Sequence, residues 1–403
     1  MASVNTVATL DGLYKSVYGD KGPINLLPDC AILQELVPFE SAERTGKSFN
    51  VPVVVSAEQG FSFGLADETI TLNTEVAATL KNLEVKGAQI VGQASINYDA
   101  ASRSMGSKQA FMSGAGLVVQ NLYESHAQKL EASLLYGTTS IGTVSSLSSQ
   151  DIILTAASFA DGLWMGKEGA VIDVYNGSSV RQAALVVSVV NPSTYTITVT
   201  GTTSGITGGD KVYLKGAYGK ECYGLDSIIT NTTSMFGIDA AAYSLWAGNS
   251  YSASSAPLTM AKILSAASMA VAKGGLNGDA VCLVHPSSWN NLNSNESALR
   301  TYQNNENKAS NGFDAIEYRY AGGKIKITSH CMVKRGEAFI FKPKDLKRVG
   351  STDISSQTPG KDNNEIFLHS STVSAYLLRT YSNQAIISTK PAAMVKITSI
   401  VPN

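Results

Sequence analysis

A short segment near the N-terminus, residues 41–48, contains the residue types of a phosphate-binding loop. Its sequence, Ser-Ala-Glu-Arg-Thr-Gly-Lys-Ser, matches such loops at Gly46, Lys47 and Ser48, which would contact phosphate and magnesium. The motif begins with a glycine so that the backbone can approach the phosphate, but this chain has Ser41 there. A helix should follow the loop, whereas Phe-Asn-Val-Pro-Val-Val-Val at 49–55 is typical of a strand. We therefore expect no nucleotide binding.

The histidines do not indicate a catalytic or metal site. His285 precedes Pro286 at the end of an apolar run, which favours a role in a turn over one as a general base. His126 falls on the apolar face of a predicted helix, as a hydrogen-bonded core or interface residue would. His330 and Cys331 are neighbours on a predicted strand, so they point to opposite faces and do not share a metal ion. No serine lies in a Gly-x-Ser-x-Gly frame, and the sequence predicts no catalytic, cofactor-binding or metal-binding residue.

The cysteines are far apart and form no pair or cluster with metal-ligand spacing. This predicts free thiols, in a reducing compartment, at Cys30, Cys222, Cys282 and Cys331. Residues 1–12 lack the basic and apolar regions of a signal peptide, and no run of eighteen apolar residues occurs. We therefore expect neither export by that route nor a membrane-spanning segment.

The charge composition points to association with other copies. The 403 residues have room for two or three domains, and 31 basic against 32 acidic residues give a net charge of -1. This balance argues against a general attraction to nucleic acid or anionic lipid. Charged residues make up only 16% of the chain, below the roughly one quarter of average domains. Surface buried between copies explains this depletion, although a neutral β protein rich in small residues has the same composition.

The elements that would position any site are organised around one long predicted helix, from Ser102 to Tyr136. At about 1.5 Å per residue it would span roughly 50 Å, more than a small domain needs. Gly106, Gly114 and Gly116 weaken its first half, so its start is expected to lie later. Its apolar stripe, which we expect to pack on the closing strands of the chain, comprises Phe111, Ala115, Val118, Leu122, His126, Leu130 and Leu134.

Strand patterns surround this helix. A ribbon of strands before it, at 49–56, 69–74, 83–86 and 90–96, has too little core of its own and needs a partner surface. After it, strands at 170–175, 184–190, 195–200 and 211–214 alternate with turn residues and predict a small inserted barrel or sandwich. Replacing residues 140–222 by a short linker should leave the remaining core intact.

The rest of the chain has a pattern that predicts helices and strands first, and then strands alone. Thr259 should cap a helix that ends at Gly274-Gly275, followed by a buried strand at 280–284, a short helix from Pro286 and a polar loop at 303–312. Closing strands are expected at 324–328, 338–341, 373–378, 384–387 and 394–397. Basic residues concentrate in this part of the chain. They would form either a solvated face or an inner surface that contacts the phosphates of packed nucleic acid. These residues are Lys324, Lys326, Lys334, Arg335, Lys342, Lys344, Lys347 and Arg348.

Several stretches carry a family resemblance. Glu-Arg-Thr-Gly-Lys-Ser-Phe-Asn-Val-Pro-Val at 43–53 looks like the rising strand of an extended loop. Leu-Val-His-Pro-Ser-Ser-Trp-Asn-Asn-Leu at 283–292 looks like a strand, proline, tryptophan and helix segment. Gly-Lys-Ile-Lys-Ile-Thr-Ser at 323–329, Gly-Glu-Ala-Phe-Ile-Phe at 336–341 and Lys-Pro-Ala-Ala-Met-Val at 390–395 look like closing strands. In this order they resemble the major capsid protein of tailed double-stranded DNA bacteriophages, the HK97-like fold.

The resemblance implies an α+β fold and a division of the chain. The parts would be an N-terminal arm (1–43), an extended β-ribbon (44–98), a spine helix of the peripheral domain (99–138), an inserted β-barrel or sandwich domain (139–224), an axial domain (225–342) and closing strands of the peripheral domain (343–403). The ribbon would lie across a neighbouring subunit, where exposed strand edges would pair between chains.

The resemblance also implies function and partners. Many copies would assemble in the host cytoplasm, as hexamers and pentamers, into an icosahedral head that encloses double-stranded DNA through non-specific contacts. A portal and a decoration protein are further expected partners, and the early start of the ribbon implies a separately encoded scaffolding protein or none. Some members crosslink Lys to Asn between subunits; Lys81 or Lys86 and Asn383 could take these roles, but no pattern requires it.

Alternative functions remain at this point. The same fold could form a bacterial nanocompartment, which a packaged genome would exclude. The Thr/Ser/Gly-rich insertion could belong to a glycan-binding surface protein, which closed shells would exclude.

Overall fold

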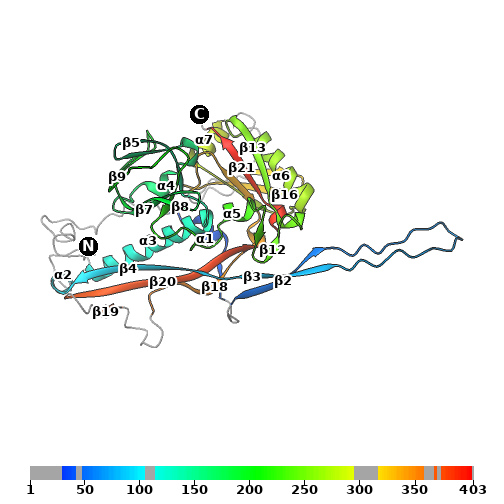
Figure 1. Cartoon of the computed structure of the whole chain (residues 1–403), viewed down its shortest axis with the longest axis horizontal. Helices are drawn as coiled ribbons and strands as arrows, with labels where there is room; N and C mark the ends of the chain where they lie inside the picture. The colour runs from blue at the N-terminus through cyan, green and yellow to red at the C-terminus, as the bar shows by residue number, and fades with distance from the viewer. Residues whose placement is uncertain are drawn as a thin grey trace, which may run out of the picture.

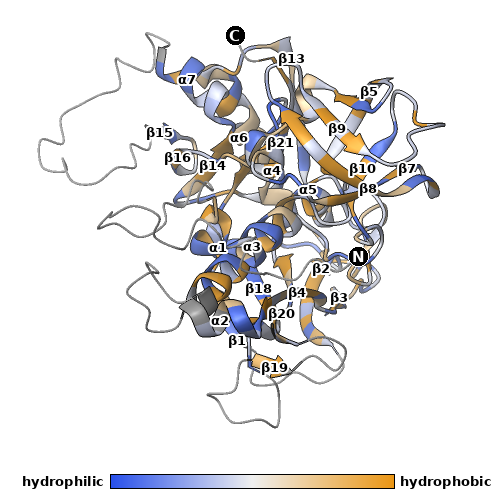
Figure 2. Ribbon diagram, turned by 90° about the vertical axis from the view of Figure 1, so that its left-hand side faces the viewer, coloured by the Kyte–Doolittle hydropathy of each residue, from blue (hydrophilic) through white to orange (hydrophobic). Residues whose placement is uncertain are grey.

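Helix α3 (Gly114–Tyr136) lies at the centre of a mixed α+β fold, between two sheets and a closed barrel. The computed structural model describes residues 30–41, 48–104, 114–294, 316–357, 367–369 and 374–401. Figure 2 shows α3 and α1 (Ile32–Leu36) between a six-stranded sheet above and a five-stranded sheet below. We call these the axial sheet and the peripheral sheet.

Strand β20 is the central strand of the peripheral sheet. It pairs antiparallel with β4 on one side and with β18 and β19 on the other, while β1 adds to β18 in parallel. Two separate strands were predicted at 373–378 and 384–387, but the polar residues between them also pair with β4 and so continue one strand. The strands are β1 (Phe39–Ser41), β4 (Ala88–Asn97), β18 (Leu346–Ser355), β19 (Phe367–His369) and β20 (Ala375–Ser388).

The apolar stripe predicted for the long helix packs where it was expected. Val118, Leu130 and Leu134 are buried, and His126 bonds to β20. Within the described residues the predicted helix is present as the end of α2 (Tyr98–Ser104) and as α3, while residues 105–113, with Phe111, lie outside them. The 23 residues of α3 span about 35 Å at the standard rise.

The axial sheet has the strand order β13-β21-β17-β14-β16-β15. Helix α6 (Met260–Gly274) packs on it and has the predicted caps: Thr259 Oγ1 accepts from Lys262 N at 3.4 Å, and Gly275 follows with φ 63°. The strands are β13 (Asn249–Ala256), β14 (Ala280–Val284), β15 (Ile316–Tyr320), β16 (Gly323–Ser329), β17 (Ala338–Phe341) and β21 (Val395–Ile400). Residues 343–403 were all expected in the peripheral domain, but β21 belongs to the axial sheet. Its backbone pairs with β13 and β17, and its apolar residues join the core of that sheet.

Six strands after α3 form a closed barrel in the order β10-β5-β6-β9-β8-β7. The barrel begins at Gly142 and ends at Leu214, and Val212 of the last strand pairs with Gly142, so the two ends of the barrel are adjacent. The strands are β5 (Gly142–Ser148), β6 (Asp151–Leu154), β7 (Val171–Asn176), β8 (Ser179–Asn191), β9 (Thr196–Thr200) and β10 (Lys211–Leu214).

A two-stranded ribbon, β2 (Phe49–Ser56) and β3 (Thr79–Val85), projects from the body of the molecule (Figure 1). Residues 57–78, here called the extended loop, continue beyond it. The strand predicted at 69–74 is therefore wrong; these residues lie beyond the last ladder pair, Ser56 with Thr79.

Short elements complete the chain. They are η2 (Ala156–Ser158), α4 (Asp161–Trp164), α5 (Leu225–Ile229), β11 (Ser234–Met235), β12 (Ile238–Asp239), η3 (Ser244–Trp246), α7 (Pro286–Ser294), η4 (Pro343–Asp345) and η5 (Pro391–Ala393). Among the described residues, no helix combines the length and apolarity needed to cross a membrane.

The basic residues predicted as one face do not form one. Lys334 and Arg348 are buried: Lys334 Nζ donates to Ser140 O at 2.8 Å, and Arg348 bonds to Gln384. Buried cations need such partners, so these two are structural. Lys324, Lys326 and Lys344 are exposed.

Candidate assembly surface and the junction behind it

The extended loop presents apolar side chains to solvent. Phe63 is 92% exposed and Leu72 is 83% exposed, on opposite arms of the loop. The apolar residues occupy alternate positions, and successive side chains of an extended chain point to opposite sides. The exposed apolar set is Phe61, Phe63, Leu65, Ile70, Leu72 and Val76. A contiguous apolar surface of this kind marks a site that another molecule covers.

The same loop is acidic. Residues 57–78 contain Glu58, Asp67, Glu68 and Glu75 and no lysine or arginine. A partner surface should therefore combine apolar pockets with basic groups at its rim.

The base of the ribbon is fixed to the body. Phe49, Val51 and Val53 are half-buried against the hydrophobic core, and Leu83 is buried within it. Glu84 N donates to Phe236 O at 3.0 Å, which pairs the ribbon with the β11–β12 hairpin. The extended loop is thus held at a fixed base with its end free to contact a neighbour.

Ionisable side chains near this base are shifted by burial. Burial raises the pKa of Glu221 to about 7, although bonds from Thr138 and Ser133 oppose the shift. Burial also lowers the pKa of Lys129 to about 8. At neutral pH Glu221 is therefore only about half ionised, whereas Lys129 keeps most of its positive charge.

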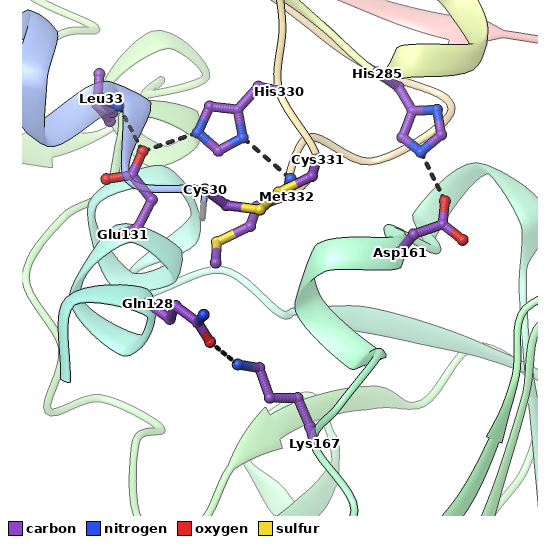
Figure 3. Close-up of a disulfide and its surroundings, with 10 residues drawn as sticks. All are labelled: Cys30, Leu33, Gln128, Glu131, Asp161, Lys167, His285, His330, Cys331 and Met332. Atoms are coloured by element: carbon purple, nitrogen blue, oxygen red, sulfur yellow. Dashed lines mark hydrogen bonds and ion pairs between the residues drawn. A yellow bond between two sulfur atoms is a disulfide. The ribbon is translucent and has the colours of Figure 1, made fainter. Parts of the chain in front are cut away.

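Behind the ribbon, one carboxylate joins the N-terminal arm, the spine helix and the axial part of the chain. Glu131 on α3 is fully buried and accepts from Leu33 N at 2.6 Å and from His330 Nε2 at 2.8 Å (Figure 3). It also accepts from Gln34 N at 3.2 Å. The side chain of Gln34 also donates a hydrogen bond, from Nε2 to Glu131 Oε2 at 3.0 Å. A buried carboxylate is tolerated only when its oxygens are bonded in this way.

A disulfide crosses the same junction and corrects the prediction of free thiols. Cys30 and Cys331 are bonded, with Cα atoms 6.1 Å apart, although 301 residues separate them in sequence. Spacing carries no signal for so distant a pair. Cys222 and Cys282 are free and buried, as expected, and burial raises their pKa values to about 11 and about 12.

A second polar link joins the barrel to the axial part. His285 Nε2 donates to Asp161 Oδ2 at 3.0 Å, and Arg335 Nη2 donates to both oxygens of Asp161 at 3.1 and 3.0 Å. The bond from His285, together with Arg335, holds the pKa of Asp161 below its ordinary value, and burial opposes this. Gln128 on α3 accepts a further hydrogen bond from Lys167, which lies three residues after α4 (Figure 3).

Ser287, His285 and Asp161 lie in the order of a hydrolase triad but serve the start of α7. Ser287 Oγ lies 2.7 Å from His285 Nδ1, and the Ser287 backbone N–H also donates to that nitrogen at 3.1 Å. The ring thereby binds the first turn of the helix, which agrees with the turn role predicted for His285.

The remaining predicted residues do not gather into one site. Ser41 ends β1, and residues 42–47 lie outside the described residues. A strand rather than a helix begins at Phe49, so the helix that a phosphate-binding loop needs after it is missing from the described residues. Asn383 lies within β20, opposite Gln89 and Thr352. Lys81 Nζ is 6.0 Å from the centroid of the Tyr243 ring. Over the described ranges, no group of three His, Cys, Asp or Glu residues could hold a metal ion.

Lys396 is a structural residue that the sequence did not single out. Its Nζ bonds to Asp226 Oδ1 at 2.5 Å and to Glu337 Oε1 at 2.9 Å. These carboxylates raise its pKa although burial lowers it. Lysine on an otherwise apolar closing strand was the available signal.

Comparison with known proteins finds similar folds in capsid subunits. Residues 199–362 match the family model described as SU10 major capsid protein. A capsid subunit of cyanophage A-1(L) matches with a TM-score of 0.56 at 12% identity, over 96% of this chain and 98% of that chain. A subunit of the capsid of the native GTA particle matches with a TM-score of 0.51 at 10% identity, over 99% and 100%. No curated protein matches this chain in sequence.

The buried carboxylate predicts a large stability effect. Glu131→Ala should lower the free energy of unfolding by about 3–5 kcal/mol, because His330 and Leu33 N lose their acceptor inside the protein. Urea unfolding measures this. Glu35→Ala, which removes an exposed carboxylate from α1, should change it by less than about 0.5 kcal/mol. Equal effects of the two substitutions would contradict the role of Glu131.

His126 predicts a pH dependence. Its ring nitrogens lie 2.9 Å from Thr380 Oγ1 and 2.8 Å from Ser382 Oγ, and burial lowers its pKa below 6.5, with Asp353 opposing. The unfolded chain therefore binds the proton more readily than the folded one. The stability from the neutral ring is complete above pH 6.5 and is lost as the pH falls through the lower pKa of the folded state.

The measurement is the free energy of unfolding of the wild type and of His126→Gln between about pH 7.5 and pH 5. Glutamine keeps hydrogen-bonding capacity without titrating, so the variant should lose less stability on acidification. Glu221 shifts in the opposite sense but is present in both proteins, so it cancels in the difference. Parallel pH profiles would show that His126 does not titrate as argued.

Proposed function

We infer that this chain, a major capsid protein of the tailed-phage type with the HK97-like fold, closes with copies of itself into the icosahedral shell of a phage head. The protein is located in the virion capsid. It acts as a structural subunit, not as an enzyme. The observation that carries the assembly role is the extended loop, whose exposed apolar residues have no core within their own subunit.

The extended loop supplies the contact between copies. We propose that it lies across a neighbouring subunit of a hexamer or pentamer and buries its apolar residues there. A contact between the loop of one copy and a different surface of the next copy is heterologous. Such a heterologous contact closes into rings when the rotation between copies fits.

Phe63→Asp tests this role. Phe63 is 92% exposed, so the subunit should fold with unchanged thermal stability while shell formation is lost. Thr71→Asp is the matched control: it places the same charge at an exposed alternate position of the same loop and should still give shells. Electron microscopy and sedimentation, with the other head proteins present, measure the outcome. Normal shells from Phe63→Asp would refute the proposed contact.

We further propose that the barrel is a domain inserted into the capsid fold. Its ends are adjacent, since Val212 pairs with Gly142, and its strands pair only with one another among the described residues. Its interior is nevertheless continuous with the main hydrophobic core. Removal should therefore lower stability without abolishing the two sheets.

A chain with residues 142–214 replaced by a short linker tests the insertion. We expect a cooperative unfolding transition at a lower temperature, measured by circular dichroism. Asp161→Ala in the full chain is the control, because it removes only the bonds to His285 and Arg335. A deletion chain with no cooperative transition would mean that the barrel is an integral part of the fold.

Other head components remain part of the proposal. A separate scaffolding protein would guide curvature, a portal would occupy one vertex, and a decoration protein would bind the outer surface. Packaged double-stranded DNA would meet the inner surface through non-specific, salt-dependent contacts to phosphate. Nucleic acid inside purified particles would distinguish a phage head from a nanocompartment.

A further inference from the structure

The disulfide lies where the N-terminal arm meets the axial part of the subunit. Cys30 lies two residues before the start of α1, and Cys331 lies in the turn after β16. Cys30 is 2% exposed. A Cβ at Gly162 of α4 would come within 2.6 Å of Cys331 Sγ, so the barrel segment also covers the bond.

The arm is docked by contacts that do not need the disulfide. Leu33 and Val37 of the α1 segment are buried. Glu131 accepts from Leu33 N, and Arg348 Nη1 donates to Gln34 O at 3.2 Å and to Val37 O at 3.4 Å. These contacts hold Cys30 beside Cys331 before any bond forms. The sulfur pair is therefore preorganised by folding.

We propose that Cys30 and Cys331 form a redox latch, open as two thiols while subunits assemble in a reducing cytoplasm and closed once particles reach an oxidising medium. The timing, but not the chemistry, rests on the proposed capsid function. Disulfides are rarely stable in reducing cytosol and persist outside it. Closing the latch turns a docked arm into one that is covalently attached to the axial part of its own subunit.

The closing reaction is thiol–disulfide exchange with a small disulfide such as oxidised glutathione. The thiolate of one cysteine attacks the small disulfide, breaks its S–S bond and releases one glutathione thiol. The second cysteine then attacks the mixed disulfide, forms the Cys30–Cys331 bond and releases the second glutathione. The protein loses two electrons and two protons, and the small disulfide gains both.

Burial makes the closed latch persistent. Cys30 is buried and Cys331 is half-buried against the core, so a reductant has limited access to the bond while the arm segment stays docked. The buried thiols Cys222 and Cys282 have no partner sulfur, and they provide internal references that should remain thiols throughout.

The first experiment measures the thiol state of the full chain. Cells producing the protein are quenched with a membrane-permeant maleimide, denatured and analysed by peptide mass spectrometry. Maleimide on both Cys30 and Cys331 is expected in quenched cells. After particles or subunits are exposed to oxidised glutathione, the two should be linked and the chain lighter by about 2 Da. A bond already closed in quenched cells, or none after oxidation, would overturn the latch.

The second experiment measures its effect on stability. Oxidised wild-type protein should melt at a higher temperature than the same protein treated with dithiothreitol. Cys30→Ser and Cys331→Ser should melt at one temperature in both conditions, whereas Cys222→Ser should keep the wild-type difference. An equal difference in Cys30→Ser would assign the effect to another group and overturn the proposal. Because subunits suffice for both measurements, a failure to form shells would refute the capsid function without affecting this test.

Discussion

The burial of the Glu131 carboxylate is the constraint around which the subunit is arranged. An unpaired buried carboxylate would cost several kcal/mol, so α3 can occupy this position only if the arm and the turn after β16 supply donors. Leu33 N and Gln34 come from the arm, and His330 comes from the axial part. One charge on the spine thereby fixes the positions of two segments that are far apart in sequence. The shared hydrophobic core between the peripheral and axial sheets then packs around this junction.

Local pattern was sufficient to predict many elements. The caps of α6 at Thr259 and Gly275, the buried strand β14 and the stripe of α3 follow from rules that act over a few residues. Four of the six barrel strands, β7 to β10, also follow from alternation and turn chemistry, whereas β5 and β6 were not predicted. These predictions hold because each element's own residues decide its conformation, whatever surrounds it.

The junction could not be predicted, since its partners are distant in sequence. Nothing local pairs Glu131 with His330 or Cys30 with Cys331. The basic residues show the same limit: Lys334 and Arg348 look like their exposed neighbours in the sequence but are buried beside acceptors from other segments. The candidate assembly surface was predicted only in part. That the ribbon lacks a core of its own follows from its local sequence. Which residues form its exposed end depends on where the pairing of β2 with β3 stops, and this could not be predicted.

Magnitudes indicate how such a subunit assembles. Full burial of the six exposed apolar residues of the extended loop, Phe61, Phe63, Leu65, Ile70, Leu72 and Val76, would contribute about 1.5–3 kcal/mol each. Their sum, about 9–18 kcal/mol, is comparable to the 4–15 kcal/mol that association costs in lost freedom. A single loop contact is therefore marginal, and two isolated subunits should not remain together. In a ring, each additional contact is made within an existing assembly and no longer carries the full association cost. In the shell that we propose, the closed particle would be stable although each of its contacts is weak, and a subunit with this loop would remain dispersed until a ring begins to close.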